Sequence, residues 1–300
     1  MRLLVTGASG QIAGALSKRL AVLGHDVWGI ARFGDAARRR ELAAAGVTTR
    51  VVDLTEPDWS AVPTDFDHVL HLAVQMGPST DFNHALQVNA VGTGRLISRF
   101  REVRSILSMS TTGVYRPDPD PWHRYAENDP LGDPTSPTTP TYGVSKIGQE
   151  AVARFAAEEF DVPVVIGRMN MSYGPGGGRP MKHLDLLLAD EVITLRYDPA
   201  PSQLIYEDDI ADHALRLLCA ASTPALVVNF GGDEAVAAQQ WIAYLGELLG
   251  RSPRTEVVPI PGSQPGIALD VTRRQSITGP DKVHWREGIR RMVEARLARA

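Results

Sequence analysis

The chain begins with a short apolar run, a glycine-containing turn and an amphipathic stretch, and this order constrains the fold more than any other feature. Residues 3–5 are apolar, as expected of a strand that is buried on both faces of a parallel sheet. Gly7 and Gly10 let the backbone turn tightly and approach a pyrophosphate, which the N-terminus of a helix predicted over 15–23 would stabilise. The alternative is a plain tight turn without a ligand.

Strand-like and helix-like stretches then alternate along the first half of the chain. Strands are predicted over 26–31, 47–52 and 67–74, with helical segments between them. This alternation predicts an α/β fold with a Rossmann-type, doubly wound parallel sheet. His68 and His71 stand three residues apart in a strand and therefore point to opposite faces, so no metal site is expected.

The residue after the second predicted strand bears on which dinucleotide would bind. An acidic residue there holds the ribose 2′-hydroxyl of NAD, whereas an arginine accommodates the 2′-phosphate of NADP. This chain has Arg32 and no carboxylate until Asp35. Because a guanidinium matches phosphate in a bidentate manner, the sequence favours NADP(H), with NAD(H) possible. Stacking of Arg32 on the adenine is the competing interpretation.

Tyr142 and Lys146 form a Tyr-x-x-x-Lys pair, which a helix would place on one face. An unperturbed phenol has a pKa of about 10, and a neighbouring ammonium lowers the pKa of that phenol. The pair therefore predicts proton transfer at a carbonyl or alcohol carbon. Thr111, 31 residues before Tyr142, offers a hydroxyl at the end of a predicted strand, with Ser110 as the reserve candidate.

Bulk composition excludes several classes of partner. A net charge of −4 gives no reason to expect nucleic acid or an anionic membrane. Cys219 is the only cysteine, which excludes an intrachain disulfide, and it is expected to be a small buried residue. No apolar stretch is long enough to span a bilayer, and the N-terminus predicts a strand instead of a secretion signal. A cytoplasmic protein with a small-molecule substrate is expected.

Together these motifs resemble an extended short-chain dehydrogenase/reductase of the NAD-dependent epimerase/dehydratase family. The resemblance continues past Tyr142 and Lys146 through residues 173–176, 205–211 and 229–232. It implies a dinucleotide-binding domain over 1–168 that carries the catalytic residues. It also implies a smaller C-terminal substrate-binding lobe over 169–300, from which the chain returns to the Rossmann core around 203–232.

The resemblance also implies individual roles. Catalysis would involve Thr111, Tyr142 and Lys146, with Asn89 ordering the lysine through a water; the alternative for Asn89 is a helix cap or kink. Adenine would contact Asp53 and Leu54. The full set of cofactor contacts would be Gly7, Ser9, Gly10, Gln11, Ile12, Arg32, Asp53, Leu54, Leu72, Ala73, Val74, Tyr142, Lys146 and Arg168. Substrate contacts would be Gln75, Thr111, Thr112, Met171, Met181 and Tyr206, although core packing explains the methionines equally well. A homodimer would pair helices around 84–102 and 142–159.

Departures from the family pattern narrow the activity. Thr112 and Gly113 stand where 4,6-dehydratases carry an acidic pair, which disfavours elimination of water. The segments before Tyr206 and before Asp270 lack the arginines that usually hold a nucleotide diphosphate. The stretch between Tyr173 and Tyr206 offers instead Arg179, Lys182 and Arg196.

The main hypothesis is therefore an NADP(H)-preferring oxidoreductase that transfers a hydride to or from a carbonyl or alcohol carbon of a small, non-nucleotide metabolite. The alternative is a sugar-nucleotide epimerase with tightly bound NAD(P). A non-catalytic dinucleotide-sensing protein is disfavoured because Tyr142 is present. Residues 116–141 contain seven prolines and predict a stiff irregular loop, either a lid or pocket wall near the substrate or a surface insertion.

Overall fold

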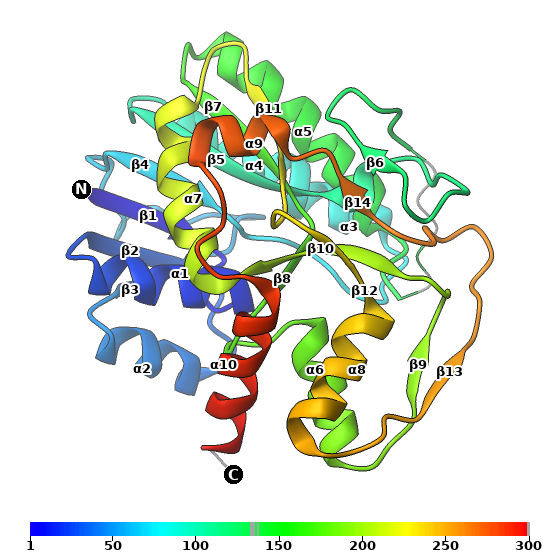
Figure 1. The fold of residues 1–300 in the computed structure, drawn as a ribbon. Helices are drawn as coiled ribbons and strands as arrows, with labels where there is room; N and C mark the ends of the chain where they lie inside the picture. Colours follow the sequence, from blue (N-terminus) through cyan, green and yellow to red (C-terminus); the bar gives the residue numbers. More distant parts are fainter. Residues whose placement is uncertain (133–135, 137, 299–300) are drawn as a thin grey trace. The chain divides into compact units, whose positions relative to one another are not determined.

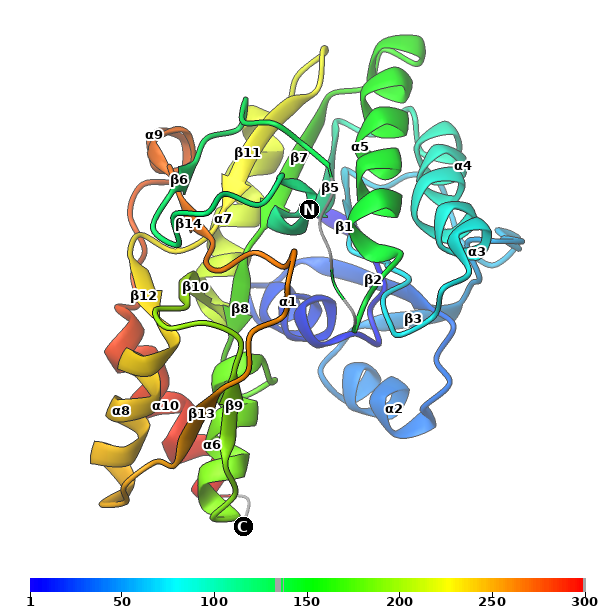
Figure 2. The same cartoon turned by 90° about the vertical axis from the view of Figure 1, so that its right-hand side faces the viewer.

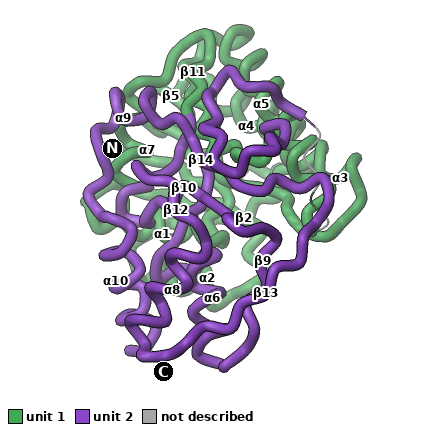
Figure 3. The backbone as a smooth tube through the Cα atoms, turned by 45° about the vertical axis from the view of Figure 1, so that its right-hand side comes forward, with its two compact units in different colours: residues 1–114, 136–168, 211–228 green, residues 115–135, 169–210, 229–300 purple. Residues whose placement is uncertain are grey.

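The computed structural model describes residues 1–132, 136 and 138–298, and Figure 1 shows their fold. The chain divides into two compact units (Figure 3): unit 1 comprises residues 1–114, 136–168 and 211–228, and unit 2 comprises residues 115–135, 169–210 and 229–300. One break follows Arg168, where the sequence places a boundary, and the return over 211–228 lies within the predicted 203–232. The sequence did not predict that 115–135 belongs to unit 2.

Unit 1 is built on a seven-stranded sheet with the order β11-β7-β5-β4-β1-β2-β3 (Figures 1 and 2). The strands are β1 (Arg2–Thr6), β2 (Asp26–Ala31), β3 (Thr48–Val51), β4 (His68–His71), β5 (Ser105–Thr111), β7 (Val164–Met169) and β11 (Leu226–Phe230). β1 pairs in parallel with both β2 and β4, so the strand order reverses at β1. Doubly wound sheets bind their ligands at the carboxyl ends of the strands beside such a reversal. The predicted Rossmann-type fold is confirmed.

Helices cover both faces of this sheet. They are α1 (Gln11–Val22), α2 (Ala36–Ala44), α3 (Phe82–Leu86), the π-helix η1 (Gln87–Val91), α4 (Gly92–Arg99), the 3₁₀ turn η2 (Thr112–Val114), α5 (Tyr142–Glu159) and α7 (Glu207–Ala220). Figure 2 shows α4 and α5 on one side of the sheet, and α1 and α7 on the other. The central strands under them are buried on both faces: every residue of β4, β5 and β7 is buried.

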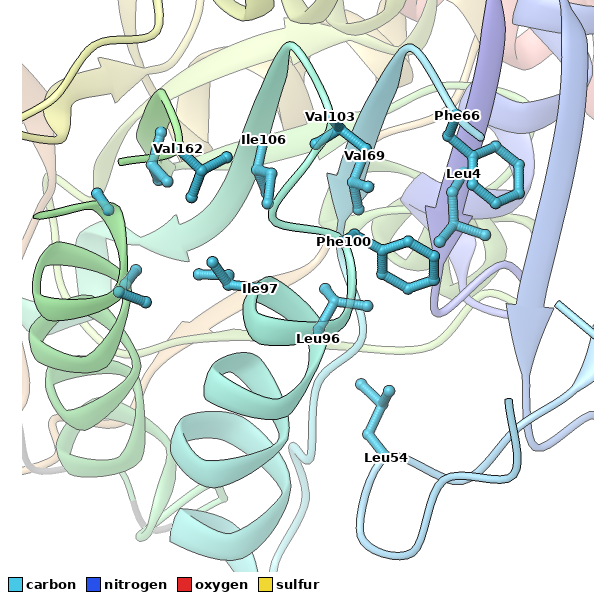
Figure 4. Packing of buried hydrophobic residues seen from close by; sticks show 14 of the residues in the cluster. Leu4, Leu54, Phe66, Val69, Leu96, Ile97, Phe100, Val103, Ile106 and Val162 are labelled. Atoms are coloured by element: carbon cyan, nitrogen blue, oxygen red, sulfur yellow. The ribbon is translucent and has the colours of Figure 1, made fainter. Parts of the chain in front are cut away.

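The core of unit 1 joins the sheet to α4. Figure 4 shows Val69 and Ile106 from the strands packed against Leu96, Ile97 and Phe100 from α4 and the turn after it. Each fully buried aliphatic side chain contributes about 1.5–3 kcal/mol of transfer free energy. This packing holds β4 and β5, whose carboxyl ends carry candidate site residues, in one rigid layer.

One long helix predicted around 84–102 is instead three segments. A π-helical turn, η1, separates α3 from α4, and α4 ends at Arg99. Such bulges are rare and occur frequently at functional sites. Gly92 follows the bulge, and a Cβ there would lie 3.2 Å from the Leu54 Cβ, so the glycine permits the close approach.

The sheets of unit 2 have two or three strands each, and the unit has a hydrophobic core of its own. Its strands are β6 (Arg124–Tyr125), β8 (Met171–Tyr173), β9 (Ile193–Leu195), β10 (Pro201–Tyr206), β12 (Ala235–Ala237), β13 (Thr255–Val257) and β14 (Ala268–Leu269). Its helices are α6 (Arg179–Leu188), α8 (Ala238–Leu249), α9 (Thr272–Thr278) and α10 (Trp285–Leu297). Trp241 and Ile289 are fully buried at its centre. Because β6 pairs with β14, the proline-rich segment around β6 is part of this unit.

Two further findings concern single residues and the membrane. Cys219 is exposed on α7, so the expectation that it is buried is wrong; it lies on the solvent side of a helix whose other face packs inward. Across the described part of the chain, none of the helices has the length and apolar character needed to cross a membrane.

The turn after β1 generates a stability prediction. Gly7 has φ +69°, and a Cβ there would lie 2.7 Å from the Cα of Ala73; Gly24 has φ +84° but nothing within 4 Å. Left-handed backbone costs about 1–2 kcal/mol for an alanine at either position. We expect Gly7→Ala to lower the free energy of unfolding by clearly more than Gly24→Ala, because only Gly7→Ala adds a collision with β4's continuation. Urea unfolding measures both; equal losses would contradict the close approach.

Candidate active site

Thr111 and Tyr142 meet at the carboxyl end of β5. A side-chain hydrogen bond joins them, and the Thr111 Oγ1 also accepts from the Gly113 amide at 3.1 Å. The hydroxyl proton of Thr111 is thus available to the phenol oxygen. Ser110, the reserve candidate, donates instead to Glu150 at 2.6 Å. The geometry therefore brings Thr111, and not Ser110, to the tyrosine.

The pKa of Tyr142 differs from the sequence-based expectation. Burial raises the pKa of the phenol, and the hydrogen bond with Thr111 lowers it without cancelling that effect. The net lowering that was predicted from Lys146 is wrong for this structure, because burial dominates the shift and Lys146 is not among its causes. Tyr142 is therefore a neutral phenol at neutral pH, ready to donate a proton.

Lys146 is a buried cation, with 2% of its surface exposed. Its Nζ donates to the Met109 carbonyl at 2.6 Å and to the Oε1 of Gln149. Burial lowers the pKa of Lys146 to about 7, while the charge of Glu150 raises it. The lysine therefore changes charge close to neutral pH.

Glu150 and Arg168 form a buried ion pair next to this lysine. The Arg168 Nε donates to one carboxylate oxygen at 2.9 Å and the Nη2 donates to the other at 2.7 Å. Arg168 was expected to contact the cofactor. With this bidentate bond and 1% exposure, it instead holds the end of β7 against α5.

Asn89 lies in the π-helix and is completely buried. Its Oδ1 accepts from the Gln75 amide at 2.7 Å, and its Nδ2 donates to the Gln75 carbonyl at 3.0 Å and the Ser145 Oγ at 2.8 Å. Ser145 in turn donates to the Tyr142 carbonyl at 3.0 Å. The direct partner of Asn89 is therefore Ser145 and not the lysine. The kink alternative is supported, since the bulge presents Asn89 to both partners.

A chain of hydrogen bonds links the first turn to this bulge through His71. The Thr6 Oγ1 accepts from the amides of Leu72 at 3.1 Å and Ala73 at 3.0 Å, so its proton goes to His71 Nδ1, 2.7 Å away. The imidazole must then carry its proton on Nε2, which lies 2.8 Å from the Thr93 Oγ1. Thr93 donates onward to the Asn89 carbonyl at 2.6 Å. Each of these side chains donates one hydrogen bond to the next group in the chain. Because His71 accepts at Nδ1 and donates at Nε2, its imidazole carries one proton and is neutral.

The turn after β1 fits the pyrophosphate of a dinucleotide. Gly10, the N-cap of α1, has no side chain to occupy the first amides, and the first turn holds no acidic residue. Ser9, Gln11 and Ile12 are partly exposed around these amides. The Thr6 bonds hold the backbone of Leu72 and Ala73 beside the turn. Helix N-termini of this kind bind anions through backbone N–H groups and the helix dipole.

The residues expected around adenine are only partly available. Arg32 is exposed after β2, while Asp35 accepts from the Ala37 amide at 2.8 Å as the cap of α2. Bonds from the amide and hydroxyl of Thr55 lower the pKa of Asp53, and the charge of Arg32 lowers it further. Leu54 packs into the core, 7% exposed, so only its backbone is left for the adenine.

Some of the residues expected to contact the substrate are buried, and others are partly exposed. Met181 and Tyr206 are buried in the core of unit 2, which is the core-packing alternative for Met181; Met171 packs against that core and is partly exposed. Thr112 is buried in η2 beside Thr111, and Gln75 is partly exposed with its backbone held by Asn89.

The proline-rich segment forms a pocket wall within unit 2. A cavity of about 520 Å³ is lined by Pro117, Asp118, Pro119, Pro121, Tyr197, Asp198, Pro199, Ser263 and Pro265. The described part of 116–141 thus lines a cavity, and its predicted place near the substrate stays a prediction. Pro134 and Pro137 lie outside the described residues.

No metal centre was found in the described part of the chain, where no three His, Cys, Asp or Glu side chains gather as metal ligands. His68 Nδ1 lies 2.8 Å from the Ser105 Oγ, and His71 takes part in the threonine chain. Both histidines are buried.

The fold and this arrangement define an extended short-chain dehydrogenase/reductase. The model of the NAD dependent epimerase/dehydratase family matches residues 3–231, and the chain belongs to that family. This confirms the resemblance that the motifs indicate.

Individual relatives agree with this assignment. The probable UDP-glucuronate 4-epimerase of Rhizobium meliloti (strain 1021) is 23% identical over 334 residues, covering 98% of this chain and 96% of the relative. A mutant UDP-glucuronic acid 4-epimerase from Bacillus cereus, solved with UDP-4-deoxy-4-fluoro-glucuronic acid and NAD, has a TM-score of 0.86 at 22% identity over 100% of both chains. The UDP-glucose 4-epimerase of Thermus thermophilus, solved with NAD, has a TM-score of 0.79 at 25% identity over 98% of both chains.

His71 generates a pH prediction. Burial, and secondly the charge of Lys146, lowers the pKa of His71 from 6.5 to about 3. The unfolded chain therefore binds this proton first, and stability that is complete above pH 6.5 is lost as the pH falls from 6.5 toward 3. Between pH 7 and pH 4, we expect urea unfolding to show an acid loss about 3 kcal/mol smaller in His71→Gln than in the natural chain.

The control is His84→Gln, which removes an exposed histidine of α3 and should keep the full acid loss. His183, whose pKa burial lowers to about 4, leaves a residual slope in every variant. Parallel profiles for His71→Gln and the natural chain would contradict the neutral imidazole.

Proposed function

We propose that this protein is an NAD-dependent epimerase that acts on a secondary alcohol carbon of a sugar nucleotide. The observation that carries the proposal is the Thr111–Tyr142 hydrogen bond at the carboxyl end of β5, with Lys146 buried on the same helix. Relatives that are UDP-sugar 4-epimerases support it. It replaces the non-nucleotide oxidoreductase as the leading interpretation.

The residues divide the proton chemistry between them. Bound NAD would supply a hydride acceptor that later returns the hydride. Tyr142 takes the proton of the reacting hydroxyl and gives it back, and the Thr111 hydroxyl steadies the oxygen on which charge develops. Taking that proton requires the phenolate form of Tyr142, which a positive charge of the bound cofactor would favour. The neutral phenol found in the structure is the donor for the return step.

We propose NAD and not NADP as the cofactor. Solved neighbours bind NAD, and the family is described by its dependence on NAD, so the NADP(H) preference inferred from Arg32 is not supported. Arg32 is exposed and would then stack on the adenine, the competing interpretation of the sequence.

Unit 2 offers a cationic pair that suits a diphosphate. The side chain of Arg179 is exposed, and the charge of Arg196 contributes to lowering its pKa, which indicates that the two cations lie near each other. Arg179 is also the first residue of α6, where the helix dipole adds positive potential. A diphosphate between these groups would relieve their repulsion. The pair would replace the arginines that the family usually carries elsewhere.

A second candidate remains the reduction of a non-nucleotide metabolite. The specific observation in its favour is Gln203, which stands in the segment before Tyr206, is fully buried, and accepts from the Leu269 amide at 3.1 Å. Position 203 therefore offers an amide, and no cation, to a diphosphate. Thermal stabilisation by UDP distinguishes the two, because a non-nucleotide enzyme gains nothing from it.

Replacing the tyrosine tests the leading proposal. In the natural chain we expect conversion of UDP-glucuronic acid or UDP-glucose to its 4-epimer, followed by NMR. Tyr142→Phe should lower kcat by about 100-fold or more, since only the transferable proton is removed, with NAD affinity by calorimetry unchanged. Tyr244→Phe, a matched change on α8, should keep full turnover. Turnover by Tyr142→Phe at the natural rate refutes the role, and a dinucleotide sensor would turn over none of these substrates.

We also propose a homodimer through η1 and α5. Val91, Val144 and Phe155 expose 42%, 44% and 64% of their surface on these neighbouring helices. Light scattering should give twice the chain mass, and Phe155→Glu should give a monomer because a buried unpaired carboxylate is costly. Val22→Glu, an exposed position on α1, should leave the dimer intact. A monomeric natural chain would refute this proposal.

A further inference from the structure

Lys146 has a neighbour with no role in the proposed chemistry. Gln149 lies three residues further along α5 and is completely buried. Its Oε1 accepts from the Lys146 ammonium, and its Nε2 donates to the Ser108 Oγ at 3.0 Å and the Met109 carbonyl at 3.2 Å. All of these residues belong to unit 1.

The orientation of the Gln149 amide is determined by these partners. If the amide were turned over, its NH₂ group would face the Lys146 ammonium, and its oxygen would face the Met109 carbonyl. Both contacts would then be repulsive, donor against donor and acceptor against acceptor. The Oε1 is therefore a preorganised acceptor for the lysine.

The Met109 carbonyl completes the arrangement. It accepts from Lys146 at 2.6 Å and from Gln149 at 3.2 Å, so ammonium, amide and carbonyl close a ring of three hydrogen-bonded groups. An ammonium has three N–H donors on a flexible stem. Because fixed acceptors hold two of these N–H groups, the third N–H group points in one defined direction.

We propose that Gln149 is a positioning residue that holds the Lys146 ammonium against the end of β5 in one orientation. This direct contact is separate from the water-mediated role that the resemblance implies for Asn89, whose side chain bonds Ser145 and Gln75. The functional meaning rests on the proposed epimerase activity, but the contact itself does not. A purely structural role, joining α5 to β5, is the competing explanation.

Titration of Lys146 tests this inference directly. The chain has four lysines, so protein labelled with ¹³C at the lysine ε-carbon gives four signals, and Lys146→Met identifies the one required. Gln149→Met keeps the length of the side chain but removes the acceptor. We expect it to lower the midpoint of the Lys146 signal by about one pH unit or more, because a buried ammonium loses a hydrogen-bond partner.

A second variant should shift the titration midpoint of Lys146 in the opposite direction. Gln149→Glu keeps an oxygen acceptor and adds a negative charge, so the Lys146 midpoint should rise. Ala157→Gly is the matched control: Ala157 lies on the same helix, is equally buried and does not contact the lysine, so this change weakens the helix alone. Its Lys146 midpoint should equal that of the natural chain.

Unmoved midpoints in both Gln149 variants, or the same shift in Ala157→Gly, would overturn the proposal. If Gln149→Met fails to fold, the rise in Gln149→Glu still decides the question. Shifted midpoints in a protein that converts no UDP-sugar would refute the proposed function and leave the positioning role standing. If the protein is active, the alkaline limb of its pH–rate profile should move in the same direction as the Lys146 midpoint of each variant.

Discussion

The structure of unit 1 depends on how it accommodates a buried cation. Moving a charge out of water is costly unless fixed polar groups replace the lost hydration. Lys146 receives a backbone carbonyl from β5 and an amide oxygen from its own helix, and Glu150 adds a nearby negative charge. That carboxylate is held in turn by Arg168. A pKa of about 7 for the lysine shows that the replacement is incomplete, which keeps its charge responsive near neutral pH.

Much of unit 1 could be predicted from the sequence because its signals are local. The first strand, the turn that follows it and the helix around 142–159 depend on apolar runs, glycines and short spacings, and the structure has them as β1, the turn after it and α5. Periodicity could not reveal the π-helical break at Asn89. That break is stabilised by partners such as Ser145, 56 residues away, and contacts at such separations leave no pattern within one segment.

The candidate site shows the same division between local and distant information. Residue types at fixed spacing identified Thr111 and Tyr142, and the structure joins them. The spacing of residues could not predict how exposed a side chain is, or whether it already bonds to another group. Arg168 had the chemistry of a ligand but is occupied by Glu150. Gln149 carries no motif, and only the fold shows that it faces the lysine.

The hydrogen-bonded chain from Thr6 through His71 to Thr93 has a consequence for how the protein can change over time. Each member supplies its neighbour with the one group that neighbour needs, so the three polar side chains behave as a single unit. If one hydroxyl is lost, the buried imidazole is left without a hydrogen-bond partner on that side. If the imidazole is lost, both hydroxyls lose a partner in an interior without water. These positions, on β1, β4 and α4, should therefore be exchanged together or kept together among descendants of this chain. The glycine turn after β1 and the π-helical bulge η1 would then be conserved or replaced together.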